Sequence, residues 1–166
     1  MIETGWVGLY KNFRTGELLF GVLLPGDRIE PLTAWGNCSA RALTSVMVRI
    51  DRETETTGQE LNHILLQCVR NHLPAPQRVM DFFAELYDRL EKIGGAKNGE
   101  FTFPLRYSDL STLLSITPVH LSRVLKQLRD SGYVAIEGHN VRLLRRHRFA
   151  RADKSGSVEV NSVAIV

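Results

Sequence analysis

Residues 107–129 have the sequence YSDLSTLLSITPVHLSRVLKQLR, which predicts two short amphipathic helices joined by a tight turn. In the first helix leucines recur three and four residues apart, and Ser108 is the expected N-cap. In the second helix Thr117 is the expected N-cap and Pro118 the first helical residue, where a missing N–H costs nothing. Two helices in this order are typical of a helix-turn-helix, whose second helix enters the major groove of DNA.

The second helix is expected to have one buried face and one free face. The apolar residues that would face inward are Leu121, Val124, Leu125 and Leu128. The residues that would share the outward face, at i, i+3, i+4 and i+7, are Val119, Ser122, Arg123 and Lys126. A polar, basic face of this size is suited to contact with the edges of base pairs.

A predicted hairpin follows these helices. Gly132 is expected to end the second helix, and the runs 133–136 and 141–144 have the composition of strands. Residues 137–140, Glu-Gly-His-Asn, form a polar turn between them. A hairpin in this position is a wing, which touches the sugar-phosphate backbone. The alternative interpretation is a helical hairpin in an unrelated α+β domain, with Arg123 as an ordinary surface charge.

The DNA-binding hypothesis assigns a role to each exposed side chain. Arg123 is the first choice for reading a base, through bidentate hydrogen bonds to guanine, with Ser122 and Val119 assisting. The phosphate contacts are expected from Thr117, His120, Lys126 and, in the wing, His139, with Pro118 packing alongside.

Positive charge is concentrated in the same part of the chain. Residues 101–166 contain ten Lys and Arg against five Asp and Glu, a net charge of +5. Residues 1–100 contain eleven against thirteen, a net charge of −2, which together give the +3 of the whole chain. Arginines in the wing or after it are expected to add salt-sensitive phosphate contacts: Arg142, Arg145, Arg146, Arg148 and Arg151. For Arg148 and Arg151 a solubilising tail is an equally good interpretation.

Composition limits the class of protein. The 166 residues are 43% apolar, which fits a folded chain of one ordinary domain or two small ones. No apolar run approaches the roughly 20 residues of a membrane span and no signal-peptide pattern is present, so we expect a cytoplasmic protein without membrane contact. No nucleophile elbow, phosphate loop or paired-carboxylate pattern is found, and we expect no enzymatic activity.

The remainder of the chain changes character twice. Residues 1–51 are rich in strand-like runs, at 6–10, 18–24 and 42–50. A helix is expected at 59–71, a break at Leu73-Pro74-Ala75-Pro76, and a second helix from Pro76 to about Ile93. The fold class predicted from this order is α+β.

With this order of elements, the chain resembles the Crp/Fnr family of bacterial transcription regulators. The residues that carry the resemblance are Gly5-Trp6-Val7, Gly16, Leu24-Pro25-Gly26-Asp27, Arg78, Pro104-Leu105, Asp109-Leu110 and 116–128. The resemblance implies a partial β jelly-roll of the cyclic-nucleotide-binding type, then a helix that pairs two subunits, then a winged helix-turn-helix. It also implies a homodimer that binds an inverted repeat in double-stranded DNA.

The resemblance divides the chain into four parts. These are a truncated sensor-like region at 1–57, a dimerisation helix at 58–73, a DNA-binding domain at 74–150 and a basic tail at 151–166. Family members are usually longer, and the β region here starts near what would be the middle of their barrel. Either the gene start lies upstream, or this is a reduced regulator whose sheet edge is covered in another way.

The sensor-like region departs from the family's ligand sites. Pro31 stands where the family's ribose-binding Glu would fall, and no Arg precedes Ser39, where an Arg would neutralise the cyclic phosphate. Arg41, on a strand, would lie on the opposite face from Ala40. We therefore expect no cyclic-nucleotide binding, and two cysteines cannot supply the four ligands of an iron–sulfur cluster.

A metal or cofactor has little support elsewhere. Cys68 and His72 lie at i, i+4 and His63 lies nearby, but a structural zinc site needs about four ligands. A buried cysteine and surface histidines explain the pattern better, and haem stays open only through His63 and His72. We therefore expect no resident cofactor.

Two further departures concern the DNA-binding part. Ser115 stands where the family often has Gly, at a cost of about 1 kcal/mol if the residue is left-handed. Val119 replaces an acidic residue that reads cytosine in several members, so it would pack on a thymine methyl instead. The rival hypothesis is a protein-interaction module that docks another regulator or RNA polymerase, with DNA contact secondary.

Overall fold

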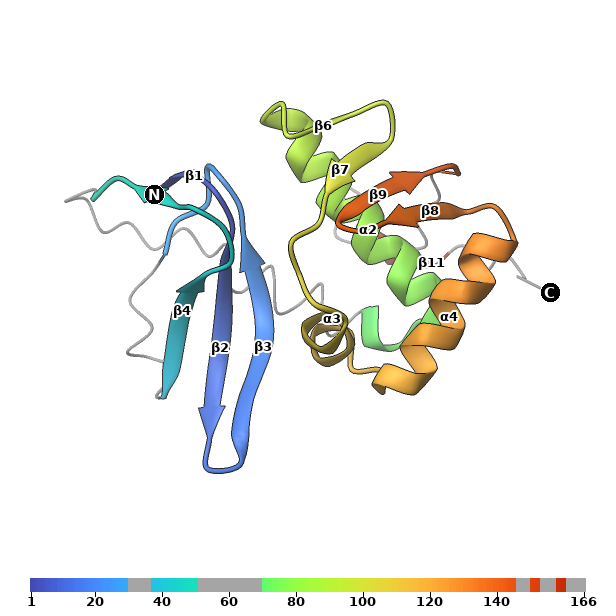
Figure 1. The fold of residues 1–166 in the computed structure, drawn as a ribbon, viewed down its shortest axis with the longest axis horizontal. Coiled ribbons are helices and arrows are strands. Elements are labelled where there is room, and N and C mark those ends of the chain that lie inside the picture. Colours follow the sequence, from blue (N-terminus) through green and yellow to red (C-terminus); the bar gives the residue numbers. More distant parts are fainter. Residues whose placement is uncertain (30–36, 51–69, 146–149, 153–157, 161–166) are drawn as a thin grey trace. The chain divides into compact units, whose positions relative to one another are not determined.

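The computed structural model describes residues 1–29, 37–50, 70–145, 150–152 and 158–160 (Figure 1). Nearly all of the helix expected at 59–71 therefore lies outside the described residues. The chain divides into two compact units. The first unit comprises Met1–Leu66 and Pro104–Pro118, and the second comprises Gln67–Phe103 and Val119–Val166. Both units contain helices and strands, in agreement with the predicted α+β class.

The first unit contains a three-stranded antiparallel sheet in the order β3-β2-β4 (Figure 1). Its strands are β2 at Val7–Phe13, β3 at Gly16–Leu23 and β4 at Cys38–Ala42. A smaller pair joins β1 at Ile2–Thr4 to β5 at Met47–Val48. The first four residues of β2 are buried, and Val7 and Leu9 form a core with Ile2 and Leu23. The strands predicted at 6–10 and 18–24 are thus confirmed, although both extend beyond the predicted bounds.

The strand predicted as one run at 42–50 is wrong. In the structure β4 ends at Ala42, the first residue of this run, and the short β5 lies inside it, with the chain turning between the two strands. The reason lies at Gly5, where a Cβ atom would meet the Ser45 carbonyl oxygen at 2.1 Å. The Trp6 amide donates to Thr44 Oγ1 at 2.9 Å, which holds the chain at residues 44–45 close to Gly5. A side-chain acceptor thus replaces the sheet ladder at this point.

Helix α3, at Tyr107–Leu113, packs against β3 within the first unit (Figure 1). The prediction that Ser108 caps this helix is wrong, because Arg106 is the N-cap and no side chain caps the helix end. The Leu110 amide already donates to the Arg106 carbonyl at 3.0 Å, so the helical ladder starts two residues before Ser108. The Ser108 carbonyl instead accepts the hydroxyl of Ser111 at 2.7 Å.

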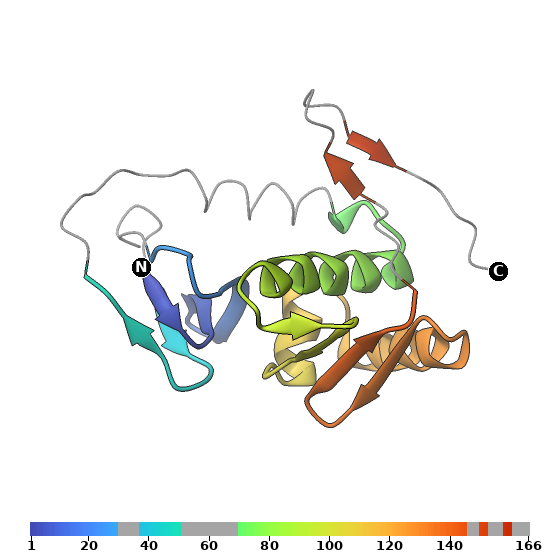
Figure 2. The same cartoon turned by 90° about the horizontal axis from the view of Figure 1, so that it is seen from above.

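The second unit is built on helix α2, at Ala75–Lys92, and a four-stranded antiparallel sheet in the order β6-β7-β9-β8 (Figure 2). These strands are β6 at Ala96–Lys97, β7 at Glu100–Thr102, β8 at Val134–Glu137 and β9 at Asn140–Leu143. α2 packs on β6 and β7 and confirms the helix predicted at 76–93. β10 at Ala150–Ala152 and β11 at Val158–Val160 form a separate pair.

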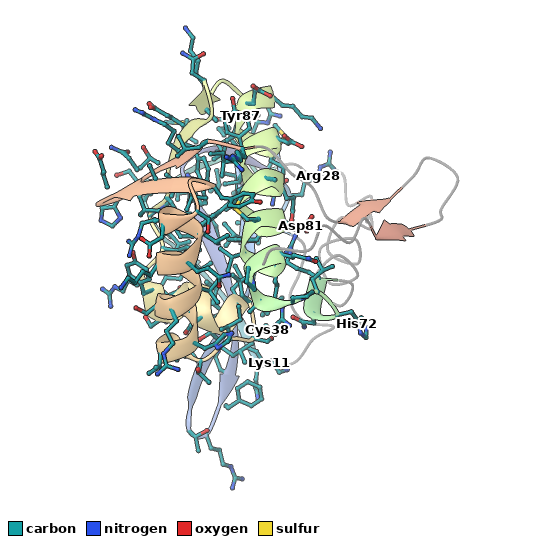
Figure 3. All side chains as sticks on the ribbon, turned by 90° about the vertical axis from the view of Figure 1, so that its right-hand side faces the viewer. Lys11, Arg28, Cys38, His72, Asp81 and Tyr87 are labelled. Atoms are coloured by element: carbon teal, nitrogen blue, oxygen red, sulfur yellow. The ribbon has the colours of Figure 1, made fainter. Side chains whose placement is uncertain are left out.

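Aromatic rings form the core between α2 and this sheet. Phe83 and Phe103 meet edge to face, with ring centroids 5.5 Å apart, and Phe101 lies against both rings. Tyr87 extends the cluster, and its hydroxyl accepts the Gly99 amide at 3.3 Å (Figure 3). Edge-to-face pairs of this kind contribute about 0.5–1.5 kcal/mol each beyond their buried area. The core thus fixes α2 against the sheet that carries the wing.

Candidate nucleic-acid interface

Helix α4, at Pro118–Asp130, carries most of the predicted DNA-binding residues. It begins at the expected proline, and its buried face consists of the four predicted residues, Leu121, Val124, Leu125 and Leu128. At the other end Gly132 has φ 68°, and the Tyr133 amide donates to the Leu128 carbonyl at 2.9 Å. A left-handed glycine after the last turn satisfies carbonyls that have no partner inside the helix. The predicted start, stop and inward face of this helix are all confirmed.

The opposite face of α4 is open to solvent. Val119 is 65% exposed, and the other exposed residues of the helix are Pro118, His120, Ser122, Arg123, Lys126, Gln127, Arg129 and Asp130. Within the described part of the chain, neither Arg123 nor Lys126 has an ion-pair partner. An exposed arginine without an ion-pair partner can donate two parallel hydrogen bonds to an acceptor on a bound molecule.

Gln127 belongs to the same face and was missed from the sequence. It lies four residues after Arg123, which is one helical turn, and beside Lys126. Its amide can bond to the N6 and N7 atoms of adenine. The i, i+4 spacing that grouped Arg123 with Val119 was sufficient to include Gln127.

The turn before α4 contains Ser115, the residue for which the sequence predicted a steric cost if its backbone were left-handed. Ser115 has φ 53°, and its amide donates to the Thr112 carbonyl at 3.1 Å. The next amide, that of Ile116, donates to the Ser111 carbonyl at 2.9 Å. These two bonds close the end of α3, so the strained conformation at Ser115 is required by the connection.

Replacing Ser115 with glycine is expected to raise the free energy of unfolding by about 0.5–1 kcal/mol. Glycine removes the steric cost of the left-handed conformation, and its greater freedom in the unfolded chain offsets part of that gain. Urea unfolding at one protein concentration measures the change. Ser122→Gly is the matched control, since it places glycine inside helix α4 and should destabilise the protein. If both variants lowered the free energy of unfolding by the same amount, Ser115 would not be strained.

The wing is formed by β8 and β9, within one residue of the predicted bounds. Gly138 has φ 59° in the turn, and His139 beside it is exposed. The wing tip is tied to the end of β7, because the Phe103 amide donates to the His139 carbonyl at 2.6 Å. His139 Nδ1 also lies 3.2 Å from the Phe103 carbonyl oxygen. When Nδ1 donates to that carbonyl, Nε2 is the ring atom left for an outside partner.

Charges on the wing largely compensate one another. Arg142 and Glu100 lie opposite each other on β9 and β7, and their side chains form an ion pair. Glu100 and Arg142 also line a shallow hollow with Ala135, Glu137, Asn140 and Val141. Arg145 lies over the Tyr133 ring at 5.4 Å, and the side chains of Arg146, Arg148 and Arg151 lie outside the described residues. Positive charge without an ion-pair partner is therefore found, among the described residues here, on α4 and at Arg145.

The domain that carries α4 and the wing matches a known family. Residues 77–152 match the Crp-like helix-turn-helix domain. This part of the chain is a Crp-like helix-turn-helix domain. A search among curated proteins gave no match.

Solved structures show the same fold over most of the chain. FixK2 from Bradyrhizobium japonicum has a TM-score of 0.65 at 21% identity, covering 88% of this chain and 82% of that one. TTHB099, a transcriptional regulator of the CRP family from Thermus thermophilus, has a TM-score of 0.62 at 18% identity, covering 87% and 81%. TTHA1359, a CRP/FNR-family regulator from the same organism, has a TM-score of 0.58 at 16% identity, covering 87% and 81%. The resemblance to Crp/Fnr regulators is confirmed at the level of fold.

The three-stranded sheet of the first unit holds Arg41 in an ion pair with Glu17. Arg41 Nη2 donates to both carboxylate oxygens of Glu17, at 2.6 and 2.7 Å, and the guanidinium lies 4.6 Å from the centre of the Tyr10 ring. The bond to Glu17 raises the pKa of Arg41, and burial raises the pKa of Tyr10. As the alternation of a strand predicts, Arg41 and Ala40 pair with successive residues of β2 and so lie on opposite faces. The region of Pro31 lies outside the described residues.

The described ranges offer no support for a bound metal ion. No group of three or more His, Cys, Asp and Glu side chains there is placed to hold a metal ion. His72 is exposed, while His63 and Cys68 lie outside those ranges. No helix in the same ranges combines the length and apolar character needed to cross a membrane.

Proposed function

We propose that this Crp/Fnr-type chain is a cytoplasmic, sequence-specific DNA-binding transcription regulator that acts as a homodimer on an inverted repeat. The observation that carries the proposal is the two-sided character of α4. Its leucine face is completely buried, while Arg123 and Lys126 project from an exposed face with no ion-pair partner among the described residues. A helix of this kind, followed directly by a wing, is the arrangement that inserts into the major groove.

Each exposed side chain has a proposed role. Arg123 reads guanine at O6 and N7, and Ser122 and Val119 contact neighbouring bases, with Val119 packing on a thymine methyl. Gln127 is a candidate for reading adenine. The contacts that position the duplex through its phosphates come from Thr117, His120, Lys126 and His139, with Pro118 packing alongside.

The proposed regulator does not bind cyclic nucleotides. Recognition of a cyclic phosphate needs a cation that is free to pair with it. Arg41 already donates to both oxygens of Glu17, so its charge is compensated within the protein. A phosphate at this position would have to displace a carboxylate, which makes binding unfavourable.

Replacing Lys126 with alanine is expected to weaken binding to all DNA sequences alike and to reduce the slope of log affinity against log salt by about 1. A lysine that contacts one phosphate releases about one counterion, and it reads no base. Fluorescence anisotropy at several salt concentrations measures the slope. Lys97→Ala is the control, because Lys97 is exposed on β6 and not on α4. A selective loss on one sequence would place Lys126 at a base instead.

Selection of binding sites from random duplex DNA tests the proposal as a whole. The full chain should select an inverted repeat with half-site centres about one helical turn, roughly 34–36 Å, apart. Sizing of the free chain should show a dimer. Binding without any motif, which disappears as salt is raised, would overturn the proposal.

A second candidate function is supported by exposed apolar side chains in the first unit. Phe13 is 56% exposed and Leu18 39%, and both lie on the β2–β3 hairpin. Met47, Val48 and Ile50 are also exposed. Such groups are typical of a surface that binds another protein, such as another regulator or RNA polymerase. A chain that selects no DNA motif and binds RNA polymerase through Phe13 would favour this function.

A further inference from the structure

A buried arginine lies at the point where the second unit begins. Arg70 is 4% exposed, and its Nε donates to Asp81 Oδ2 at 3.1 Å. Its Nη2 donates to Glu85 Oε2, and the guanidinium lies 5.3 Å from the centre of the Phe82 ring. All three partners are on α2, and Figure 3 marks Asp81 on that helix. One side chain from before the Leu73-Pro74 break is therefore held by two carboxylates after it.

A second arginine spans the same break in the opposite direction. Arg78, on the first turn of α2, donates through Nη2 to the carbonyls of Asn71 at 2.9 Å and Leu73 at 3.0 Å. Burial lowers the pKa of Arg78. The Leu73 amide donates to the Arg70 carbonyl at 2.9 Å, which makes the connection a closed turn. Residues 70–74 are thus bound to α2 through both side chain and backbone.

The chemistry of this cluster indicates a role in geometry more than in stability. Removing charges from water is costly, and well-packed apolar residues often stabilise a core as much as a buried ion pair does. What the ion cluster adds is a fixed orientation of the chain at Arg70. A planar guanidinium can donate to both carboxylates in only a few arrangements. The direction in which the chain enters α2 is therefore fixed at Arg70.

We propose that Arg70 is a positioning residue that sets the spacing between the two DNA half-sites. The inference rests on the proposed homodimer, in which the segment at 58–73 joins two copies of the second unit. A rotation of about 10° at residue 70, acting over the roughly 25 Å of a domain this size, moves α4 by about 4 Å. Adding one base pair between the half-sites moves a domain by roughly 3.4 Å along the duplex and also turns it by about 34–36°, so a change of spacing demands both a shift and a rotation at this joint. A joint without the ion network would therefore accept several spacings.

The test uses the full chain and duplexes in which the selected half-site is repeated with its spacing changed by one base pair at a time. The parent should prefer one spacing over its neighbours by about tenfold or more, and should bind a single half-site more weakly. The triple variant Arg70→Met, Asp81→Leu, Glu85→Met replaces the charged cluster with apolar residues of similar size. It should bind a single half-site as the parent does, while its preference among spacings falls to about threefold or less.

Arg70→Lys is the second variant, for the case that the triple variant does not fold. Lysine keeps the charge but lacks the planar fork, so spacing preference should weaken while half-site affinity stays constant. A folded, dimeric variant that keeps the parent's spacing preference would overturn the inference. A variant that becomes monomeric would also overturn it and would place Arg70 at the subunit interface. Failure of the proposed function gives a different result, since the parent itself would then show no inverted-repeat preference.

Discussion

Replacing Arg70 with alanine is expected to lower the free energy of unfolding by about 3–5 kcal/mol. The substitution leaves the carboxylates of Asp81 and Glu85 in a largely buried position, where their side chains are only 8% and 14% exposed. Removing one partner of a buried ion pair is costly because water does not replace it, although Glu85 keeps a second ion pair with Arg89 at 3.6 Å. Urea unfolding followed by circular dichroism, at one protein concentration, measures the loss.

Arg142→Ala is the matched control for this prediction. Arg142 also forms an ion pair within the second unit, but it and Glu100 are 58% and 48% exposed. Water replaces the lost partner at such a site, so the expected loss is about 0–1 kcal/mol. Similar losses in the two variants would show that burial does not control the energy of the Arg70 cluster.

Replacing Arg123 with alanine is expected to cost about 1–3 kcal/mol of binding free energy on the selected site and to relax the preference at one base pair. The side chain is exposed on α4, and the buried leucines on the other face of the helix are untouched. The fold should therefore persist while the readout is lost. Titration of a panel of duplexes with single base-pair changes locates the affected position.

Arg129→Ala separates this effect from a simple loss of charge. Arg129 is exposed in the last turn of α4, after every residue that is proposed to read a base. Its removal should weaken binding slightly and leave base preference unchanged. If Arg123→Ala behaved in the same way, the proposed docking face of α4 would be wrong.

Local sequence patterns predicted the DNA-binding half well. The leucine spacing of α4, Pro118 at its start and Gly132 after its end depend on contacts within a few residues, so they can be recognised without the fold. The same kind of reasoning failed at Ser108, where the helix began earlier because the Arg106 carbonyl accepted the first ladder bond. An N-cap depends on where the preceding chain becomes extended, and composition alone does not determine that point.

Pairings between distant residues were set only by the tertiary structure. Arg70 meets residues 11 and 15 positions later in the chain, because the Leu73-Pro74 turn folds it back onto α2. Arg41 lies 24 positions from Glu17, and Arg142 meets Glu100 because β7 and β9 are neighbours. From the sequence, Arg142 was expected to contact phosphate and Arg41 was weighed as part of a ligand site, but none of the three arginines was assigned a partner within the protein. The sequence by itself determined which helix faces solvent and carries the basic side chains, since helical periodicity is local. The tertiary structure decided which arginines remain available to DNA, because charge compensation depends on which strands and helices become neighbours.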